Sequence, residues 1–366
     1  MQEEHVVMYA YIGCRTTRRR AARGRGIEVY RVSGEGREWS HVQTFTDLTN
    51  PSYLAINDAG DRLYCIHGDR SDISAFAISA EDGTLSLLNQ RSTGGANPVH
   101  LALDPTQRYI VISNHLSSSL AVMALEEDGS LGERVQLVEL EGTPGPHRVE
   151  QMLSKPHANP FTCQGRFVVV PDKGLDCLFI IPFDPEQGRL DEETMTRARL
   201  REGAGPRHIA FHPWLDQAYV INELDATLTR FHLIESDAGG LEMVACQRLS
   251  SVEETWCGDN RAAAVIVDVT GRHVFVSNRG DDSIGIYDVL LEDEGRLQWR
   301  GSVASGGKTP RYLGMDPLNG HLHIANEDSD CLVSGIPGVE QGVSQFTQVH
   351  QLETPSPVCV VFRYLS

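Results

Sequence analysis

Eight ionisable residues recur at two fixed places in a repeated strand-turn-strand unit of this sequence. The first place is the second residue of a unit. The other place lies seventeen residues after the first residue of the unit. The residues are His157, Arg207 and Arg311 at the first place, and His115, Lys173, Glu223, Arg279 and Glu327 at the second. Imidazole and carboxylate groups can transfer protons, and guanidinium groups can hold an anion or a developing oxyanion. Gathered in one concave site, they would suit acid–base chemistry on an anionic substrate.

The repeated unit consists of a small or Pro-containing turn, an apolar run, a second turn and another apolar run. Units begin at Pro51, Pro98, Pro156, Pro206, Ala262, Pro310 and Pro357. Successive starts lie 47, 58, 50, 56, 48 and 47 residues apart. A period of this length built from short β-runs is typical of the four-stranded blades of a β-propeller.

Further apolar runs complete the units. Third runs are expected at 74–78, 120–125, 178–183, 228–233 and 284–289, and weaker fourth runs at 85–91 and 297–303. The last unit stops after one strand, and the first residues of the chain supply the others. Sharing a blade between both termini closes the ring and removes exposed sheet edges. The sequence therefore predicts an all-β, seven-bladed propeller with four antiparallel strands per blade, spanning residues 1–366 as one domain.

The geometry of a blade predicts that the eight residues converge. The innermost strand of a blade runs from one face of the ring to the other and the second strand returns, so the start of the first strand and the end of the second lie on the same face. The neighbouring Asn222 and Asn278 are included as substrate-binding candidates. An alternative is that these polar residues only solvate the rim of a water-filled channel.

Three long connections are expected over the same opening. Insertions at 142–155 and 249–261 each precede an inner strand, and Trp256 in the second could stack on a ligand. The connection from Cys14 to Gly26 carries six arginines, which could attract an anion or could simply form a mobile, solvated loop. His100 and His208, one step further along their strands, are expected to point toward a neighbouring blade.

Composition limits the partners and the compartment. The net charge of −18 argues against binding to nucleic acid or to anionic membranes. The N-terminus lacks the pattern of a signal peptide, and no apolar run is long enough to span a membrane. Eight scattered cysteines favour reduced thiols, and the chain is expected to be cytoplasmic. The sequence leaves the oligomeric state open.

Several segments together resemble the lactonase family of seven-bladed propellers, which contains bacterial 6-phosphogluconolactonases and fungal 3-carboxy-cis,cis-muconate lactonizing enzymes. The segments include GAGPRHIAFHP, AYVINEL, GRHVFVSNRGDDSI, SKPH and TPRYLGMDP, and the resemblance extends over nearly the whole chain. It implies that His157, Arg207, Glu223 and Arg279 are the catalytic and anion-binding residues. The chain departs from many relatives at Ala264 and Ile266, where they carry Glu and His.

Hydrolysis of a lactone needs a base for water, a group that stabilises the tetrahedral oxyanion, and an acid for the leaving alkoxide. We expect Glu223 or His157 to act as the base and Arg207 and Arg279 to hold the substrate's anion and the oxyanion. The same groups could catalyse the reverse, lactone-forming cycloisomerisation, and a non-catalytic propeller that binds partners is a further alternative. No cofactor or metal is expected, because two arginines beside Glu223 would repel a cation.

Overall fold

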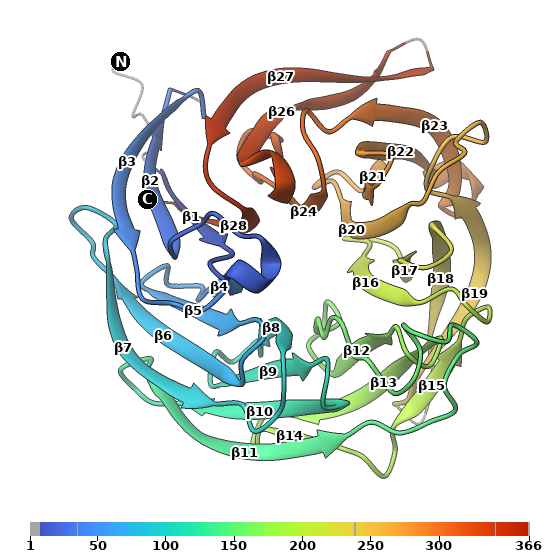
Figure 1. Ribbon diagram of the computed structural model, residues 1–366. Helices are drawn as coiled ribbons and strands as arrows, with labels where there is room; N and C mark the ends of the chain where they lie inside the picture. Colours follow the sequence, from blue (N-terminus) through green and yellow to red (C-terminus); the bar gives the residue numbers. More distant parts are fainter. Residues whose placement is uncertain (1–7, 35, 238, 341, 365–366) are drawn as a thin grey trace.

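The computed structural model describes residues 8–34, 36–237, 239–340 and 342–364. These residues form seven four-stranded antiparallel sheets, which surround a central opening like the blades of a propeller (Figure 1). The predicted fold class is therefore confirmed. Helical structure within the described ranges is limited to three short 3₁₀ turns, η1 (Arg18–Arg20), η2 (Leu291–Asp293) and η3 (Glu327–Ser329).

We number the blades along the chain and give the strands of each blade from the centre outwards. Blade 1 contains β28 (Pro357–Tyr364), β1 (Met8–Cys14), β2 (Ile27–Ser33) and β3 (Glu38–Phe45). Blade 2 contains β4 (Pro51–Ile56), β5 (Arg62–His67), β6 (Asp72–Ile78) and β7 (Leu85–Ser92). Blade 3 contains β8 (Pro98–Leu103), β9 (Tyr109–Asn114), β10 (Ser119–Leu125) and β11 (Leu131–Glu139).

The other blades follow in ring order. Blade 4 contains β12 (Phe167–Asp172), β13 (Cys177–Asp184), β14 (Arg189–Leu190) and β15 (Thr196–Arg199). Blade 5 contains β16 (Pro206–Phe211), β17 (Gln217–Asn222), β18 (Thr227–Glu235) and β19 (Leu241–Ser250). Blade 6 contains β20 (Arg261–Val267), β21 (His273–Arg279), β22 (Ser283–Leu290) and β23 (Arg296–Ala304). Blade 7 contains β24 (Pro310–Met315), β25 (Leu322–Asn326), β26 (Cys331–Glu340) and β27 (Val343–Glu353).

The two ends of the chain close the ring as predicted. In blade 1, β28 pairs with β1 in a register that runs from Met8 opposite Tyr364 to Gly13 opposite Cys359. A strand from one terminus thus hydrogen-bonds to a strand from the other. Unfolding either end would expose an unpaired sheet edge, so this pairing fixes the blades around one opening.

Blade 4 departs from the expected four regular strands. Its innermost segment forms only two isolated bridges, Pro156 with Asp172 and Phe161 with Val168, and its outer strand is split into β14 and β15. The prolines of the inner segment lack the N–H group that a strand ladder requires. The fully buried Asn159 compensates, since its amide donates to the Val111 carbonyl and accepts from the Ser113 hydroxyl.

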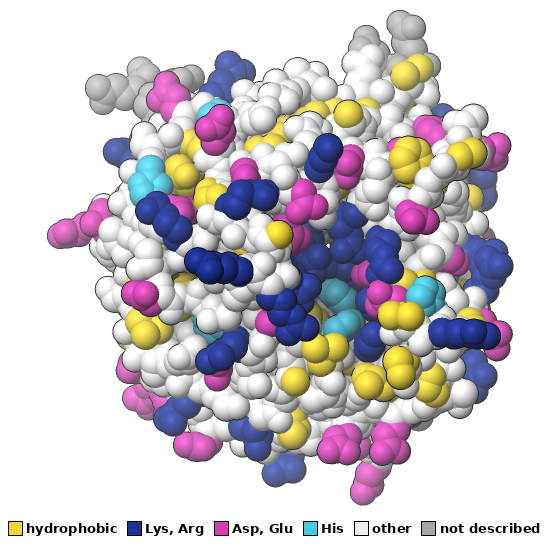
Figure 2. Space-filling model, in the orientation of Figure 1, with side chains coloured by type: hydrophobic (Ala, Val, Ile, Leu, Met, Phe, Trp, Pro, Cys, Tyr) yellow, Lys and Arg dark blue, Asp and Glu magenta, His cyan; other side chains and the backbone are white. Residues whose placement is uncertain are grey.

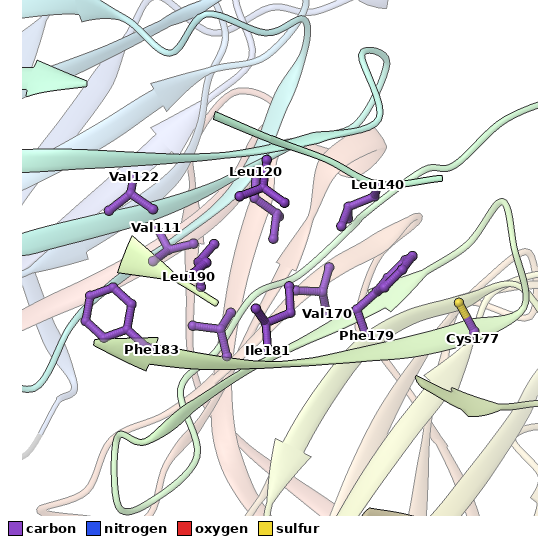
Figure 3. Close-up of a cluster of buried hydrophobic side chains, with 12 residues drawn as sticks. Val111, Leu120, Val122, Leu140, Val170, Cys177, Phe179, Ile181, Phe183 and Leu190 are labelled. Carbon is purple, nitrogen blue, oxygen red and sulfur yellow. The ribbon is translucent and has the colours of Figure 1, made fainter. Parts of the chain in front are cut away.

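The apolar core lies between neighbouring blades rather than in the centre of the ring. Figure 3 shows one such cluster, in which Val111 and Leu120 of blade 3 face Val170, Phe179 and Ile181 of blade 4. Alternating apolar residues on the strands make these contacts, because successive side chains point to opposite faces of a sheet. Burying each large side chain contributes about 1.5–3 kcal/mol, so adjacent blades hold one another in place.

A β-bulge near the start of the inner strand decides which side chains enter the opening. The register shifts between Pro51 and Tyr53, and at the equivalent positions of blades 3, 5, 6 and 7. A bulge places two residues opposite one, which breaks the strict in–out alternation. Two consecutive side chains of such a strand can then face the opening, as Arg207 and His208 do.

Candidate active site

The central opening forms a cavity of about 320 Å³ lined by charged and imidazole side chains. Figure 2 shows the lysine, arginine and histidine side chains gathered in the hollow at the middle of this face. Eight basic residues line the cavity against three acidic ones, which leaves an excess of five positive charges. The whole chain carries a net charge of −18, so the positive charge is concentrated where a ligand would enter.

Seven of the candidate site residues come together in this cavity. They are His115, His157, Lys173, Arg207, Glu223, Arg279 and Arg311. They come from blades 3 to 7 and are separated by up to about 200 positions in sequence. The register of the repeat, which aligns the same positions of successive units, therefore predicted their convergence.

Asn222 and Asn278, in contrast, do not face the cavity. Both side chains are fully buried, and Asn222 donates to the hydroxyls of Thr227 and Thr229 while Asn278 donates to the Ser251 carbonyl. Neighbouring residues of a strand point to opposite faces, so an asparagine next to a cavity residue must point away from it. Their prediction as substrate-binding residues is wrong; they hold the connections between strands.

Two other predicted binding residues also lie outside the cavity lining. Glu327 lies behind it and pairs with Arg15 at 2.8 Å and Arg311 at 3.6 Å. Trp256 donates its indole N–H to the Gly258 carbonyl within its own insertion. The part of this insertion around Glu253 packs outwards, because Glu253 accepts a hydrogen bond from the backbone of Ser302 on the outer strand β23, although Arg261 at its end contacts Glu223. The expected position of Trp256 over the opening is therefore wrong.

His208 lines the cavity, although it was expected to point toward a neighbouring blade. The bulge in β16 turns both Arg207 and His208 inwards, and simple strand alternation did not foresee this. The His208 ring lies 5.4 Å from the ring of His157 and 6.0 Å from that of His100. His157 and His208 line the cavity, whereas His100 is not among its lining residues and lies with Nδ1 3.1 Å from Asn159 Oδ1 of the neighbouring blade, as expected.

Glu223 lies at the centre of a cluster of cations. Its two carboxylate oxygens contact Arg207 at 3.2 Å and Arg279 at 3.1 Å, and Lys173 and Arg261 at 3.3 Å each. The side chains of Glu223 and Arg207 are only 5% and 3% exposed. A buried charge needs partners of the opposite sign, and here one carboxylate is shared by four cations.

This environment determines the proton affinity of Glu223. Burial alone would raise the pKa of its carboxyl, but Arg279, Lys173 and Arg207 outweigh burial and hold that pKa well below its usual value. The carboxylate is therefore ionised at neutral pH and binds a proton weakly. Its place among the cations suits an anchor for the arginines better than a base.

Backbone carbonyls fix the arginines in addition to Glu223. Arg207 donates to the Ala263 carbonyl, and Arg279 donates to the carbonyls of Arg261 and Ala262 at 3.1 Å each. Arg207 of blade 5 is thus tied to blade 6, whereas the carbonyls that hold Arg279 belong to its own blade. Side chains held at several points are preorganised to bind an anion without paying further for their own ordering.

The cavity histidines are uncharged at neutral pH. Burial, and then the charge of Arg207, lowers the pKa of His157 well below its usual value. Burial and Lys173 lower the pKa of His115 to about 3. The Nδ1–H of His115 donates to the Pro156 carbonyl at 3.2 Å, and Nε2 of His208 accepts from Arg207 at 3.2 Å. His157 Nδ1 has no hydrogen-bond partner among the described residues.

Buried neutral histidines should make folding sensitive to acid. The pKa is lowered to about 4 for His100 and to about 3 for His115 and His323, mainly by burial. The unfolded chain, with ordinary histidine pKa values near 6.5, binds protons first. The free energy of unfolding should therefore fall as the pH drops below 6.5, by up to about 1.4 kcal/mol per pH unit for each histidine. Urea unfolding at pH 7.0, 5.5 and 4.5 measures this dependence.

A variant isolates the histidine contribution from that of the carboxyl groups. Burial raises the pKa of Asp172 to about 6. Protonation of this carboxyl group therefore stabilises the folded protein as the pH falls, which is the opposite of the histidine effect. His323 packs at 4.5 Å from Phe362, away from the cavity, so His323→Phe should flatten the pH dependence while keeping an aromatic ring at this place. An unchanged slope in His323→Phe would contradict the assignment of a neutral buried imidazole.

Sequence reasoning missed several residues of the site. Glu150 contacts Arg261 at 2.8 Å and Lys173 at 3.1 Å, and Lys155 lies 3.8 Å from Glu150. The oversized spacing around 142–155 indicated that this insertion covers the opening, but not which side chains enter it. Tyr53, like His208, is turned inwards by the bulge of its strand.

The described residues provide neither a cluster of metal ligands nor a membrane-spanning helix. No group of three or more histidine, cysteine, aspartate or glutamate side chains within the described ranges could hold a metal ion. In the same part of the chain, no helix has the length and apolar character needed to cross a membrane.

Comparison with known proteins identifies the family. Residues 9–362 match the family model described as lactonase, 7-bladed β-propeller. The 6-phosphogluconolactonase of Bacillus subtilis is 31% identical over 342 residues, which cover 92% of this chain and 94% of that protein. A crystal structure from Bacteroides fragilis shares 25% identity at a TM-score of 0.86, with 99% of each chain covered. The periplasmic gluconolactonase of Pseudomonas aeruginosa has the same fold, with a TM-score of 0.81, 24% identity, and 98% and 99% of the chains covered. This chain belongs to the lactonase family of seven-bladed β-propellers.

Proposed function

We propose that this protein is a lactone hydrolase that opens a small anionic sugar-acid lactone in its central cavity. One observation carries the proposal: in a member of the lactonase family, uncharged imidazoles and preorganised guanidinium groups line one positively charged cavity. An ester carbonyl bound there would find a proton acceptor and oxyanion stabilisation together. The Bacillus subtilis relative bears the name of a lactone-hydrolysing enzyme, which agrees with this reaction.

In the proposed mechanism, His157 accepts a proton from the attacking water. Arg207 and Arg279 donate hydrogen bonds to the oxyanion that forms on the lactone carbonyl. When the tetrahedral intermediate collapses, the ring C–O bond breaks and the protonated His157 returns its proton to the leaving alkoxide. The product is a hydroxy acid, whose new carboxylate remains near the two arginines until it leaves.

The contacts of the two side chains favour His157 over Glu223 as the base. Glu223 is held by four cations, whereas His157 Nδ1 has no hydrogen-bond partner among the residues that the structure describes. An anionic substrate would also offset the charge of Arg207, one of the causes that lower the pKa of His157. Substrate binding should thus increase the basicity of His157 when the base is needed.

The lactone-forming cycloisomerase stays a second candidate, because the same acid–base group and arginines could add a carboxylate to a double bond. Both directions are tested on purified protein with 6-phosphogluconolactone, gluconolactone and carboxymuconate, after subtraction of spontaneous lactone hydrolysis. We expect turnover of a lactone and none of carboxymuconate. Turnover of carboxymuconate alone would replace hydrolysis by cycloisomerisation, and no turnover of any of them would overturn the proposal.

Arg207→Gln should lower kcat/KM for lactone hydrolysis by about 100-fold, because one donor to the oxyanion is lost. Proton release at constant pH measures the rate. Arg272→Gln is the matched control, since Arg272 is an exposed arginine at the opposite end of the inner strands of blade 6. If Arg207→Gln kept the wild-type kcat/KM, Arg207 would have no part in the reaction.

A further inference from the structure

We propose that Arg15, Arg19, Arg20 and Arg311 form a second anion-binding subsite, which we call the distal subsite. It would bind a negatively charged group at the tail of the substrate, a phosphate or a carboxylate, while the lactone carbonyl lies at Arg207 and Arg279. This inference rests on the proposed lactone hydrolysis and adds the residues that select the tail of the substrate.

Arg15, Arg19 and Arg20 of the distal subsite lie across the opening from the cluster around Glu223, and Arg311 lies between the two groups, because its charge also acts on the pKa of Glu223. Arg15, Arg19 and Arg20 belong to the β1–β2 connection of blade 1, and Arg311 belongs to β24 of blade 7. The partners of Glu223 come from blades 4, 5 and 6. Figure 1 shows β1, β28 and β4 on one side of the opening and β12 and β16 on the other. Because both groups line the same cavity, one elongated ligand could contact both.

Arg15 has a buried guanidinium group with too few hydrogen-bond acceptors around it, as expected of a residue that binds an anion. It is 4% exposed, and its Nε lies 2.8 Å from Glu327. Its Nη1 is buried and has no hydrogen-bond partner among the described residues. Burial, followed by the charge of Arg311, lowers the pKa of Arg15 to about 9. A buried donor without an acceptor beside a like charge is costly, and an anion bound in the cavity would relieve both costs.

The connection that carries these arginines is anchored to blade 2. The backbone N–H groups of Thr16 and Thr17 donate to the side-chain oxygen of Asn50 at 2.9 and 3.1 Å. Arg20 donates to both carboxylate oxygens of Asp69, which also accepts from Asn50 at 3.0 Å. These hydrogen bonds hold residues 16–20 against blade 2, with Arg19 and Arg20 on the cavity, so this segment is not the solvated loop considered from the sequence.

The charges of the distal subsite do not balance. Four guanidinium groups, of Arg15, Arg19, Arg20 and Arg311, face two carboxylates, of Asp69 and Glu327. The excess of two positive charges matches a terminal group with one or two negative charges, such as a carboxylate or a phosphate. Guanidinium groups bind either anion through paired N–H donors, so the subsite should favour charged tails over a neutral hydroxymethyl tail.

The test compares three lactones that differ in the tail: gluconolactone with a neutral tail, glucarolactone with a carboxylate and 6-phosphogluconolactone with a phosphate. Selectivity is the ratio of kcat/KM for a charged-tail lactone to kcat/KM for gluconolactone. We expect Arg15→Gln and Arg19→Gln each to lower this selectivity by about 10- to 100-fold, the effect of one charge-assisted hydrogen bond. Arg18→Gln is the control, because Arg18 lies in the same η1 turn but does not line the cavity.

Arg19 is exposed, so Arg19→Gln should fold even if the buried substitution at Arg15 impairs folding. The assays with glucarolactone and with 6-phosphogluconolactone identify which tail the subsite binds. Loss of selectivity for either lactone supports the proposal. Equal loss of activity toward all three lactones, or the same effect from Arg18→Gln, would overturn it.

A binding measurement separates this inference from the proposed hydrolysis. Calorimetry compares 6-phosphogluconate with gluconate on the wild type, Arg15→Gln and Arg19→Gln. If the wild type hydrolysed no lactone but bound 6-phosphogluconate more tightly than the two variants, hydrolysis would fail and the distal subsite would stand. If the wild type hydrolysed lactones but no variant weakened 6-phosphogluconate binding, the subsite would fail and hydrolysis would stand.

Discussion

Replacing His157 by glutamine is expected to lower kcat for lactone hydrolysis by about 10²- to 10⁴-fold, the range for loss of a general base. Glutamine keeps a polar side chain of similar reach but cannot accept the proton from water. The backbone N–H of residue 157 donates to the Pro171 carbonyl, and this bond survives the substitution. Initial rates and a thermal unfolding curve measure activity and folding separately.

The pH dependence of kcat/KM is a second, independent test of His157 as the base. Because burial and Arg207 hold the pKa of His157 well below 6.5, the wild-type kcat/KM should stay level from neutral pH to below pH 6.5. It should fall only at lower pH, where the imidazole becomes protonated and the base is lost. His157→Gln should lack this acid limb. His232→Gln on β18, away from the cavity, is the control, and a His157→Gln enzyme with wild-type kcat would refute the role of His157.

Glu223→Gln is expected to destabilise the folded protein by about 3–5 kcal/mol, the cost of removing one partner from a buried ion pair. The substitution keeps the shape of the side chain but leaves Arg207 and Arg279 facing one another without the carboxylate between them. Chemical unfolding at pH 7 measures the loss. Glu150→Gln, whose carboxylate is more exposed, should cost about 1 kcal/mol or less.

Two further measurements distinguish an anchor from a base at position 223. In a double-mutant cycle, Arg207→Met should recover part of the stability lost in Glu223→Gln, because it removes one of the unpaired buried cations. The acid limb assigned to His157 should persist in Glu223→Gln, although kcat/KM falls as the arginines shift. A Glu223→Gln protein as stable as the wild type would contradict the anchoring role. Loss of the acid limb in Glu223→Gln would indicate that Glu223 is the base.

The sequence allowed more of the site to be predicted than its scattered residues suggest. Because the unit repeats at a nearly constant period, aligned positions in successive units had to lie around one ring. His157, Arg207, Glu223 and Arg279 therefore converge as expected, although they come from blades 4, 5 and 6. A fold without repeats would have given no such register.

Local irregularities account for the predictions that were wrong. His208 was assigned to a blade interface because strands alternate, but the bulge in β16 turns it into the cavity. Asn222 was placed beside Glu223 in the site, although strand alternation does hold at the end of β17. Trp256 belongs to an insertion whose direction depends on a contact with Ser302, and no periodic pattern encodes such a contact.

The sequence by itself determined the number of blades, the closure by both termini and the face on which charged residues gather. Those properties follow from the period of the apolar runs, which neighbouring blades must bury against one another. Only the tertiary structure decided that Glu223 is shared by four cations and that Arg15 reaches the cavity from the opposite side. Such contacts depend on side-chain direction and burial across the opening, where residues distant in sequence meet within hydrogen-bonding range.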